Sequence, residues 1–333
     1  MKRRHLLIAS GAYAALLPFS ARPQKPGKVP ILAIVSGHGA QPQPGIALRS
    51  PLQQRLLELG WEDGRNLRIE RHTAEGQLER ARAIFADLAA RSVDIIYTSG
   101  TLGSHVMAEL AQRATRSIPI VFNGGGIDPV GQGLVASLAR PGGNVTGFSI
   151  SLGPEFALKR LELMKQIVPG IKRVAALGPV AHFEANIQHW RDGLAMLGLS
   201  LFPAPVEKED DYERAFATAM RERANGLLVV NVSLNYVHRS RIIALAARHR
   251  LPAEYFFREA VDSGGLAAYG VDVLDLQHGA AGYIDRILRG ARPGDLPIVL
   301  PTKFELSINL KTAKALGLTI PQQVLLRADR VIE

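Results

Sequence analysis

Short apolar segments alternate regularly with amphipathic helical segments along this chain, and the alternation starts again after about residue 146. In the first half, residues 29–36, 94–97 and 118–122 are rich in β-branched or aromatic side chains, and a polar turn and a helical segment follow each of them. Strands that alternate with helices build a parallel sheet with helices on both faces. The pattern therefore predicts an α/β fold.

The second half repeats the order of the first: a strand, a polar turn, a helix, a proline and another strand. The strand and the proline are 24 residues apart in one half (Ile95 to Pro119) and 25 apart in the other (Leu227 to Pro252). Any two strand–helix–strand units share some of this likeness, but 333 residues also exceed one average domain. We expect two Rossmann-like lobes with parallel sheets.

The chain continues after both lobes are built, so we expect it to cross between them more than once. We assign 29–146 plus 266–298 to the first lobe and 147–265 plus 299–333 to the second. Several crossings make a hinge, and the cleft between two hinged lobes is where a small ligand binds.

Residues 1–28 are typical of an export signal followed by a tether. Lys2, Arg3 and Arg4 give a positive start, and residues 6–19 form an apolar stretch of signal length, too short to cross a bilayer comfortably. The arginine pair also resembles a twin-arginine signal, so the export route and the cleavage site stay open. An ordinary amphipathic helix or a retained anchor are the alternatives. We expect export to the periplasm.

Charge and catalytic motifs narrow the class of function. The net charge is +10, but residues 1–28 hold six basic residues and no acidic one, which leaves 34 basic against 30 acidic residues. The rest of the charge is interleaved, so we expect no nucleic-acid partner. The sequence has no cysteine, no G-x-S-x-G, no phosphate-binding loop, and no H-E-x-x-H or H-x-x-x-H pair. We expect no enzyme activity, no cofactor and no metal.

Polar side chains gather where the expected strands end. Ligands of open α/β sheets bind beyond the carboxyl ends of the strands, and helix N-termini there favour a carboxylate. Hydroxyl and amide groups orient a ligand without reacting with it, although each of these residues can instead cap a helix. The polar residues at strand ends are Ser36, Ser99, Thr101, Asn123, Asp128, Asn231, Ser233 and Asn235.

Several longer motifs together resemble one family. They are DPVG at 128–131, GLVASLARPGGNVTG at 133–147, KRLEL at 159–163, AARHRLP at 246–252, GGL at 264–266 with YG at 269–270, and PTKFEL with INLKTAKALG between 301 and 317. The chain from Val29 to Glu333 resembles the ABC transporter substrate-binding protein family. Its members have a type 1 periplasmic binding fold and include tryptophan- and phenylalanine-type binders.

The resemblance implies a monomer that captures a small solute by hinge closure and delivers it to ABC permease and ATPase subunits, without catalysis or cofactor. For an amino acid, the carboxylate would lie near residues 99–101 and the ammonium group would face Asp128 or another carboxylate. The identity of the solute stays open. A ligand-sensing ectodomain that feeds a signalling partner is the alternative.

The resemblance also implies which residues contact the solute. Three segments depart from the family pattern where the ligand should lie, at 37–45, 178–182 and 254–257. Within the last of them, Glu254 either meets an ammonium group or lies at the surface, and we favour the surface. On the first side the expected contacts are Ser36, Ser99, Gly100, Thr101, Asn123, Asp128 and Ser149. On the other side or near the hinge they are Asn186, Asn231, Ser233, Tyr255 and Tyr269.

Overall fold

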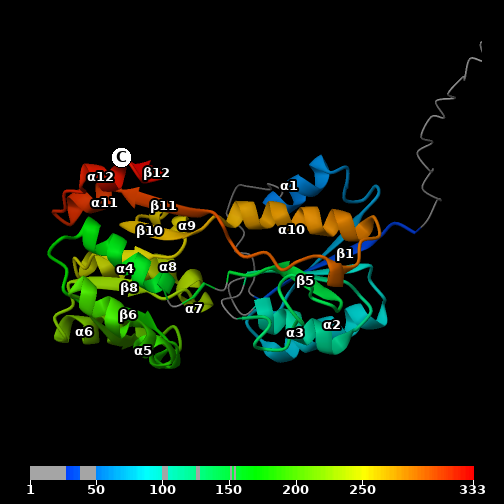
Figure 1. The fold of residues 1–333 in the computed structure, drawn as a ribbon, viewed down its shortest axis with the longest axis horizontal. Coiled ribbons are helices and arrows are strands. Elements are labelled where there is room, and N and C mark those ends of the chain that lie inside the picture. Colours follow the sequence, from blue (N-terminus) through cyan, green and yellow to red (C-terminus); the bar gives the residue numbers. More distant parts are fainter. Residues whose placement is uncertain (1–27, 38–49, 100–103, 125–127, 151, 154) are drawn as a thin grey trace, which may run out of the picture.

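A computed structural model describes residues 28–37, 50–99, 104–124, 128–150, 152–153 and 155–333. They form two α/β lobes that lie side by side (Figure 1). This confirms the predicted fold class. The predicted export signal lies outside the described residues.

The first lobe is built on a five-stranded parallel sheet in the order β2-β1-β3-β4-β5. Its strands are β1 (Ile31–Ser36), β2 (Arg68–Thr73), β3 (Ile95–Ser99), β4 (Ile120–Asn123) and β5 (Val145–Phe148). Its helices are α1 (Pro51–Glu58), α2 (Leu78–Ala90), α3 (Ser104–Ala114) and, much later in the chain, α10 (Val273–Leu288), followed by the short η1 (Pro293–Asp295). Helix α10 packs against α1 (Figure 1).

The second lobe holds a seven-stranded sheet in the order β12-β11-β10-β9-β8-β6-β7, in which only β10 and β11 pair antiparallel. The strands are β6 (Arg173–Gly178), β7 (Ser200–Pro205), β8 (Gly226–Val229), β9 (Ala253–Tyr255), β10 (Ala267–Val271), β11 (Phe304–Asn309) and β12 (Arg330–Ile332). The helices are α4 (Glu155–Ile167), α5 (Val180–Leu197), α6 (Asp211–Arg221), α7 (Ser233–Val237), α8 (Arg239–Arg248), α9 (Arg258–Asp262), α11 (Leu310–Ala315) and α12 (Gln322–Leu325).

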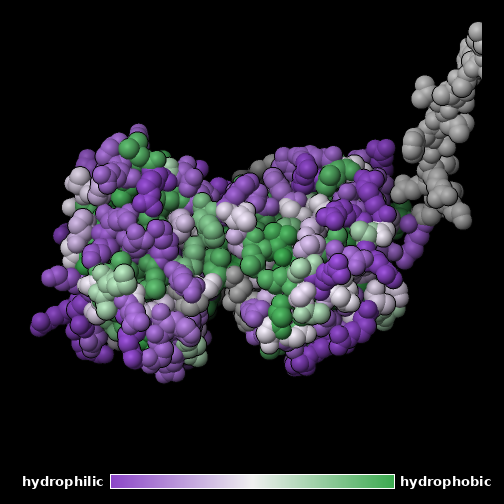
Figure 2. Space-filling view, viewed as in Figure 1, coloured by the Kyte–Doolittle hydropathy of each residue, from purple (hydrophilic) through white to green (hydrophobic). Residues whose placement is uncertain are grey.

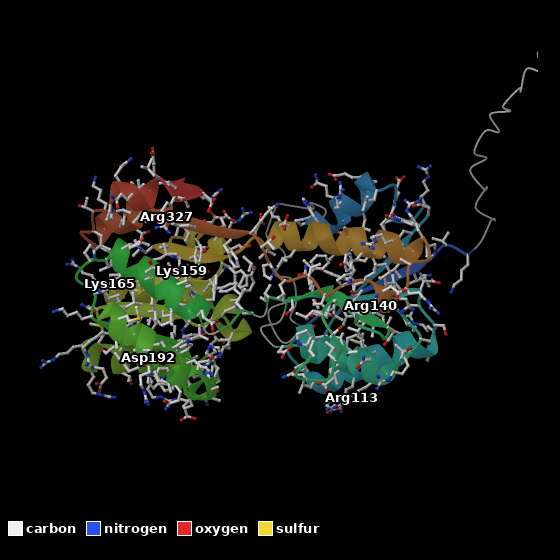
Figure 3. All side chains as sticks on the ribbon, viewed as in Figure 1. Arg113, Arg140, Lys159, Lys165, Asp192 and Arg327 are labelled. Carbon is white, nitrogen blue, oxygen red and sulfur yellow. The ribbon has the colours of Figure 1, made fainter. Side chains whose placement is uncertain are left out.

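Local sequence explains where several helices begin and end. Asp272 caps α10, because its Oδ1 accepts hydrogen bonds from the backbone N–H groups of Leu274 and Asp275. Helix α5 ends at Gly198, whose φ of 63° lies in the left-handed region that glycine adopts without steric cost. Charged side chains project from the outer surfaces of both lobes (Figure 3).

Three crossings join the lobes, and one predicted boundary is wrong. The chain leaves the first lobe after β5, returns between β10 and α10, and leaves again before β11. We expected residues 266–298 in the first lobe, yet β10 pairs with β9 and β11 in the second sheet. The crossing therefore lies at Asp272, because the ladder hydrogen bonds of β10 are made in the second sheet.

The crossings fix how the two sheets face one another. The first leaves the carboxyl end of β5 and the second leaves the carboxyl end of β10. In both sheets the carboxyl edge of the parallel strands therefore points towards the other lobe. Figure 2 shows a groove between the lobes, with hydrophobic residues on both of its sides.

Candidate ligand-binding cleft

The wall from the first lobe is a row of uncharged polar groups. Strand register aligns Ser36 with Ser99 and Ser99 with Asn123, so the three residues stand side by side at the sheet edge, as the sequence predicts. The amide of Asn123 donates to the hydroxyl of Tyr97 at 3.1 Å. Burial raises the pKa of Tyr97 to about 12, which keeps its hydroxyl neutral. This wall can give and accept hydrogen bonds without adding charge.

The other predicted residues of the first side are less clearly aimed at a ligand. Asp128 is exposed, and its Oδ1 accepts the backbone N–H of Val130 at 2.9 Å. Ser149 is buried in the first hinge crossing, where its backbone N–H donates to the carbonyl oxygen of Val299 at 2.9 Å. Gly100 and Thr101 lie outside the described residues.

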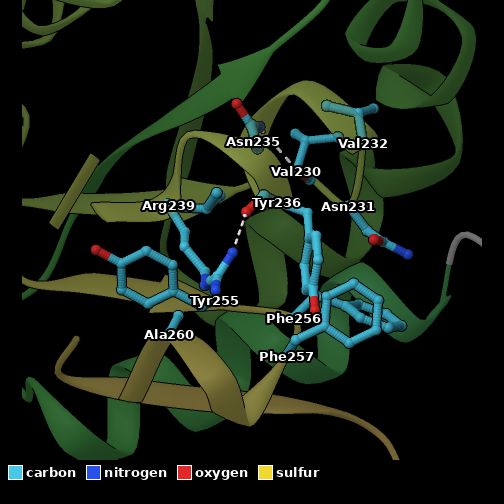
Figure 4. A pocket seen from close by; sticks show the side chains of 11 residues that line it. Val230, Asn231, Val232, Asn235, Tyr236, Arg239, Tyr255, Phe256, Phe257 and Ala260 are labelled. Carbon is cyan, nitrogen blue, oxygen red and sulfur yellow. Dashed lines mark hydrogen bonds between the residues drawn. The ribbon is translucent and has the colours of Figure 1, made fainter. Parts of the chain in front are cut away.

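The wall from the second lobe is aromatic. A hollow of about 20 Å³ opens beyond the carboxyl ends of β8 and β9 (Figure 4). Its rings come from Tyr236 on α7 and from Phe256 and Phe257 after β9. The centroids of Phe256 and Phe257 are 4.7 Å apart, and those of Tyr236 and Phe257 are 5.2 Å apart. We call these three side chains the aromatic wall.

Asn231 is the predicted residue that best fits this wall. It is half-buried and lines the hollow, and its amide points away from Arg239 and Tyr255 in Figure 4. Its side chain makes no hydrogen bond with any residue that the structure describes. An amide in this position is available to a ligand.

Asn235 and Tyr255 have different surroundings from Asn231. Asn235 is buried, donates to the carbonyl oxygens of Leu177 and Val230, and accepts from the hydroxyl of Tyr212. The hydrogen bonds of the Asn235 side chain are therefore all made within the second lobe. Tyr255 is buried, and its ring points away from Asn231 and the aromatic wall (Figure 4).

Asn186 and Ser233 lie on helices that follow strands β6 and β8. The amide of Asn186 donates to the carbonyl oxygen of His182, one turn earlier in its own helix α5. Ser233 is the first residue of α7, and its side chain lies outside the description.

Tyr269 belongs to an aromatic cluster at the hinge. Its ring stacks on Phe156 of α4, with centroids 5.3 Å apart, and Phe156 also contacts Phe304 and Phe256 at 5.1 and 5.8 Å. These rings come from α4, β10, β11 and the loop after β9. Tyr269 is a predicted contact, and Phe256 lies in the segment 254–257 that we expected near the ligand. Phe156 and Phe304 were not expected at this site, because they are distant in sequence from the other rings.

A buried ion pair lies beneath the aromatic wall. Nη2 of Arg160 on α4 is 2.6 Å from Oε2 of Glu254 on β9, and the side chains are 5% and 2% exposed. Glu254 also accepts the backbone N–H of Tyr269, and Arg160 donates to the carbonyl oxygen of Val229. The expectation that Glu254 lies at the surface is therefore wrong: its strand sits in the middle of the sheet, and Arg160 supplies the opposite charge.

Glu254 predicts a specific dependence of stability on pH. Burial raises the pKa of Glu254 to about 7, with Arg160 opposing the shift. The pKa of Glu254 in the folded state is above its usual value of 4.5, so protonation of Glu254 stabilises the folded state. This stabilisation is full below pH 4.5 and is lost as the pH rises through about 7. Relative to Glu254→Gln, the wild-type free energy of unfolding should fall over this range by an amount on the order of 3 kcal/mol. Urea unfolding at a series of pH values measures it, and a constant difference would contradict the assignment.

The family model described as ABC transporter substrate binding protein matches residues 28–332. The chain belongs to this family. The protein is thus the solute-binding component of an ABC transporter, and the expectation that it is not an enzyme is confirmed. Its family role is to hold a solute and release it unchanged, which agrees with a cleft walled by hydroxyl, amide and aromatic groups.

Individual relatives support the same family. A tyrosine-binding protein of Clostridioides difficile is 29% identical over 275 residues, covering 79% of this chain and 74% of that protein. A conserved domain protein from Vibrio cholerae has a TM-score of 0.79 and 28% identity over 91% of this chain and 100% of that one. A domain from Streptococcus pneumoniae in complex with L-Trp has a TM-score of 0.78 and 24% identity, covering 92% and 100% of the two chains, which shows the shared fold.

The described part of the substrate-binding protein shows neither a metal-binding cluster nor a membrane-spanning helix. Among the described residues, no three histidine, cysteine, aspartate or glutamate side chains gather as they would around a metal ion. Over the same part of the chain, no helix has the length and apolar character needed to span a membrane.

Proposed function

We propose that this substrate-binding protein captures an aromatic amino acid in the cleft between its lobes. The aromatic wall carries the proposal, since Tyr236, Phe256 and Phe257 line the hollow beside the free amide of Asn231. Rings prefer tilted or offset contacts with other rings, which adds affinity beyond simple burial. Relatives that bind tyrosine and L-Trp support the same class of ligand.

The polar row of the first lobe suits the other end of such a ligand. Ser36, Ser99 and Asn123 lie in one register at the sheet edge and can hydrogen-bond a carboxylate. Asp128 remains our proposal for the partner of the ammonium group. One of its oxygens accepts the N–H of Val130, and a carboxylate accepts several hydrogen bonds at once.

Binding on one lobe alone is not enough for an amino acid. The hollow on the second lobe, about 20 Å³, holds little more than a water molecule. The ligand therefore needs walls from both lobes, and closing the hinge brings them together. Closure is a shift of population towards a closed state that the ligand binds better.

The wider setting is also part of the proposal. Residues 1–28 have the charge and apolar pattern of an export signal, which supports delivery of the protein to the periplasm. The family implies an ABC permease and its ATPase as partners of the closed form. We propose that the protein acts there as a monomer.

Titration calorimetry with an amino-acid panel tests the ligand class. We expect L-tryptophan, L-tyrosine and L-phenylalanine to bind more tightly than L-leucine by at least about tenfold, as ring contacts add to apolar burial. Equal affinities for all four, or binding of unrelated solutes only, would overturn the proposal. Native mass spectrometry of the purified protein would reveal any ligand retained from the cell.

Replacing Asn231 by alanine should weaken binding of the preferred amino acid about tenfold, because a hydrogen bond to a charged ligand group is lost. The free energy of unfolding should stay within about 0.5 kcal/mol of the wild-type value, since this side chain has no partner in the described fold. Gln188→Ala, on the exposed side of α5, is the control and should change neither quantity. Unchanged affinity of Asn231→Ala would remove this residue from the site.

A further inference from the structure

A second pocket lies at the opposite end of the second lobe from the cleft. It opens between α8, α11 and the loop that leads from α9 into β10, and its volume is about 120 Å³. Leu251 and Ala253 line it before and at the start of β9, and Gly264 and Gly265 line it just before β10. These are the amino ends of strands whose carboxyl ends face the cleft, so the pocket and the cleft open at opposite ends of the sheet and share only Tyr255 among their lining residues.

Small residues create this pocket. Ala246 and Ala247 face it from α8, and Ala315 faces it from α11. A Cβ atom on Gly265 would lie 2.8 Å from Cε2 of the Tyr255 ring and 2.9 Å from the carbonyl oxygen of Ala260. Only glycine lets the Tyr255 ring lie against the chain here. The walls are mostly apolar, and an apolar cavity of similar size, about 150 Å³, accepts a benzene molecule.

Tyr255 contributes a polar side chain to the pocket. Its residue is 3% exposed and lines both the pocket and the hollow in the cleft. Within the described part of the chain, its hydroxyl has no hydrogen-bond partner. The hydroxyl oxygen itself is not fully buried, so it can hydrogen-bond solvent or a ligand.

Arg250 adds a positive charge at the edge of the same pocket. It lines the pocket, is exposed, and forms no ion pair or side-chain hydrogen bond with any described residue. Its neighbour Arg248 is instead paired with Glu213. A guanidinium beside an apolar pocket binds a carboxylate through two parallel hydrogen bonds when the geometry allows.

We propose that this distal pocket is a second binding site, for a small carboxylate with a flat apolar body about the size of benzoate. The apolar body fills the space lined by Ala246, Ala247 and Ala315. The hydroxyl of Tyr255 hydrogen-bonds the ligand, and Arg250 neutralises its carboxylate. The site is independent of the aromatic amino acid proposed for the cleft.

Benzoate is the probe, followed by NMR of the purified, isotope-labelled protein. We expect saturable shifts of the Gly264 and Gly265 amides, with a dissociation constant on the order of 1 mM. Arg250→Gln should weaken benzoate about tenfold and leave the neutral analogue benzamide unchanged. Tyr255→Phe should weaken both probes by a factor of about five.

Filling the pocket separates this site from the cleft. Ala247→Phe and Ala315→Phe enter it from opposite walls, and both positions are exposed, so the fold should tolerate them. Each should abolish the benzoate shifts while leaving amino-acid binding in calorimetry unchanged. Absence of saturable shifts at Gly264 and Gly265, shifts that survive both filled variants, or shifts confined to the cleft would overturn the proposal. If the wild-type protein showed the benzoate shifts but bound no amino acid in calorimetry, this proposal would stand and the proposed function would be wrong.

Discussion

Arg160→Met is expected to lower the free energy of unfolding by about 3–5 kcal/mol at about pH 8. At this pH Glu254 is ionised in the wild-type protein, because its pKa is about 7. Removal of Arg160 leaves a carboxylate that is 2% exposed without its opposite charge. The variant also loses the hydrogen bond from Arg160 to the carbonyl oxygen of Val229, at the end of β8. Guanidinium chloride unfolding, followed by circular dichroism, measures the loss.

The neighbouring residue provides a matched control. Lys159 is 42% exposed and pairs with Glu162 on the surface of α4 (Figure 3). Lys159→Met should cost at most about 1 kcal/mol. At about pH 5 the cost of Arg160→Met should shrink, since Glu254 then carries a proton in both proteins. Similar costs for the two methionine variants, or a cost for Arg160→Met that does not depend on pH, would refute this account of the ion pair.

Gly270→Ala is expected to destabilise the second lobe by more than about 4 kcal/mol or to prevent folding. A Cβ atom at this position in β10 would lie 1.8 Å from the carbonyl oxygen of Phe256 and 3.1 Å from its Cδ1. The closest atom belongs to the backbone, so no change of rotamer relieves the overlap. Since Phe256 is part of the aromatic wall, the fraction of the Gly270→Ala variant that folds should also bind its amino acid more weakly than the wild-type protein.

Gly282→Ala is the matched control for Gly270→Ala. Gly282 lies inside α10, and an added Cβ atom would meet nothing within 4 Å. Alanine favours the helical backbone more than glycine does, so this variant should gain up to about 1 kcal/mol. Thermal unfolding of the two variants should therefore shift in opposite directions. A Gly270→Ala protein with wild-type stability would show that the approach of Phe256 is not a constraint.

Sequence patterns anticipated the strands and the residues at their ends. The expected strands near Ile95, Pro119 and Leu227 correspond to β3, β4 and β8, because β-branched runs flanked by polar turns depend on neighbours in sequence. The row of Ser36, Ser99 and Asn123 followed, since parallel strands end at one edge of their sheet. Asn231 was found by the same reasoning.

The burial of Glu254 and the lobe to which β10 belongs could not be predicted from local sequence. Nothing near Glu254 in sequence marks it as buried, because its partner Arg160 is 94 residues away. Local sequence also does not show which lobe holds β10, since β10 pairs with β9 and β11 of the second lobe although the next element, α10, belongs to the first. Pairings of this kind depend on contacts between distant segments, which local patterns do not record.

The sequence by itself determined that the chain builds two α/β lobes and ends its strands in polar residues, because periodicity and turn chemistry act over a few neighbouring residues. Only the tertiary structure decided where the crossings lie, which rings form the aromatic wall and how Glu254 is neutralised. Those outcomes required α4, β9, β10 and β11 to pack together, and a buried charge or ring is acceptable only where such packing supplies its partner.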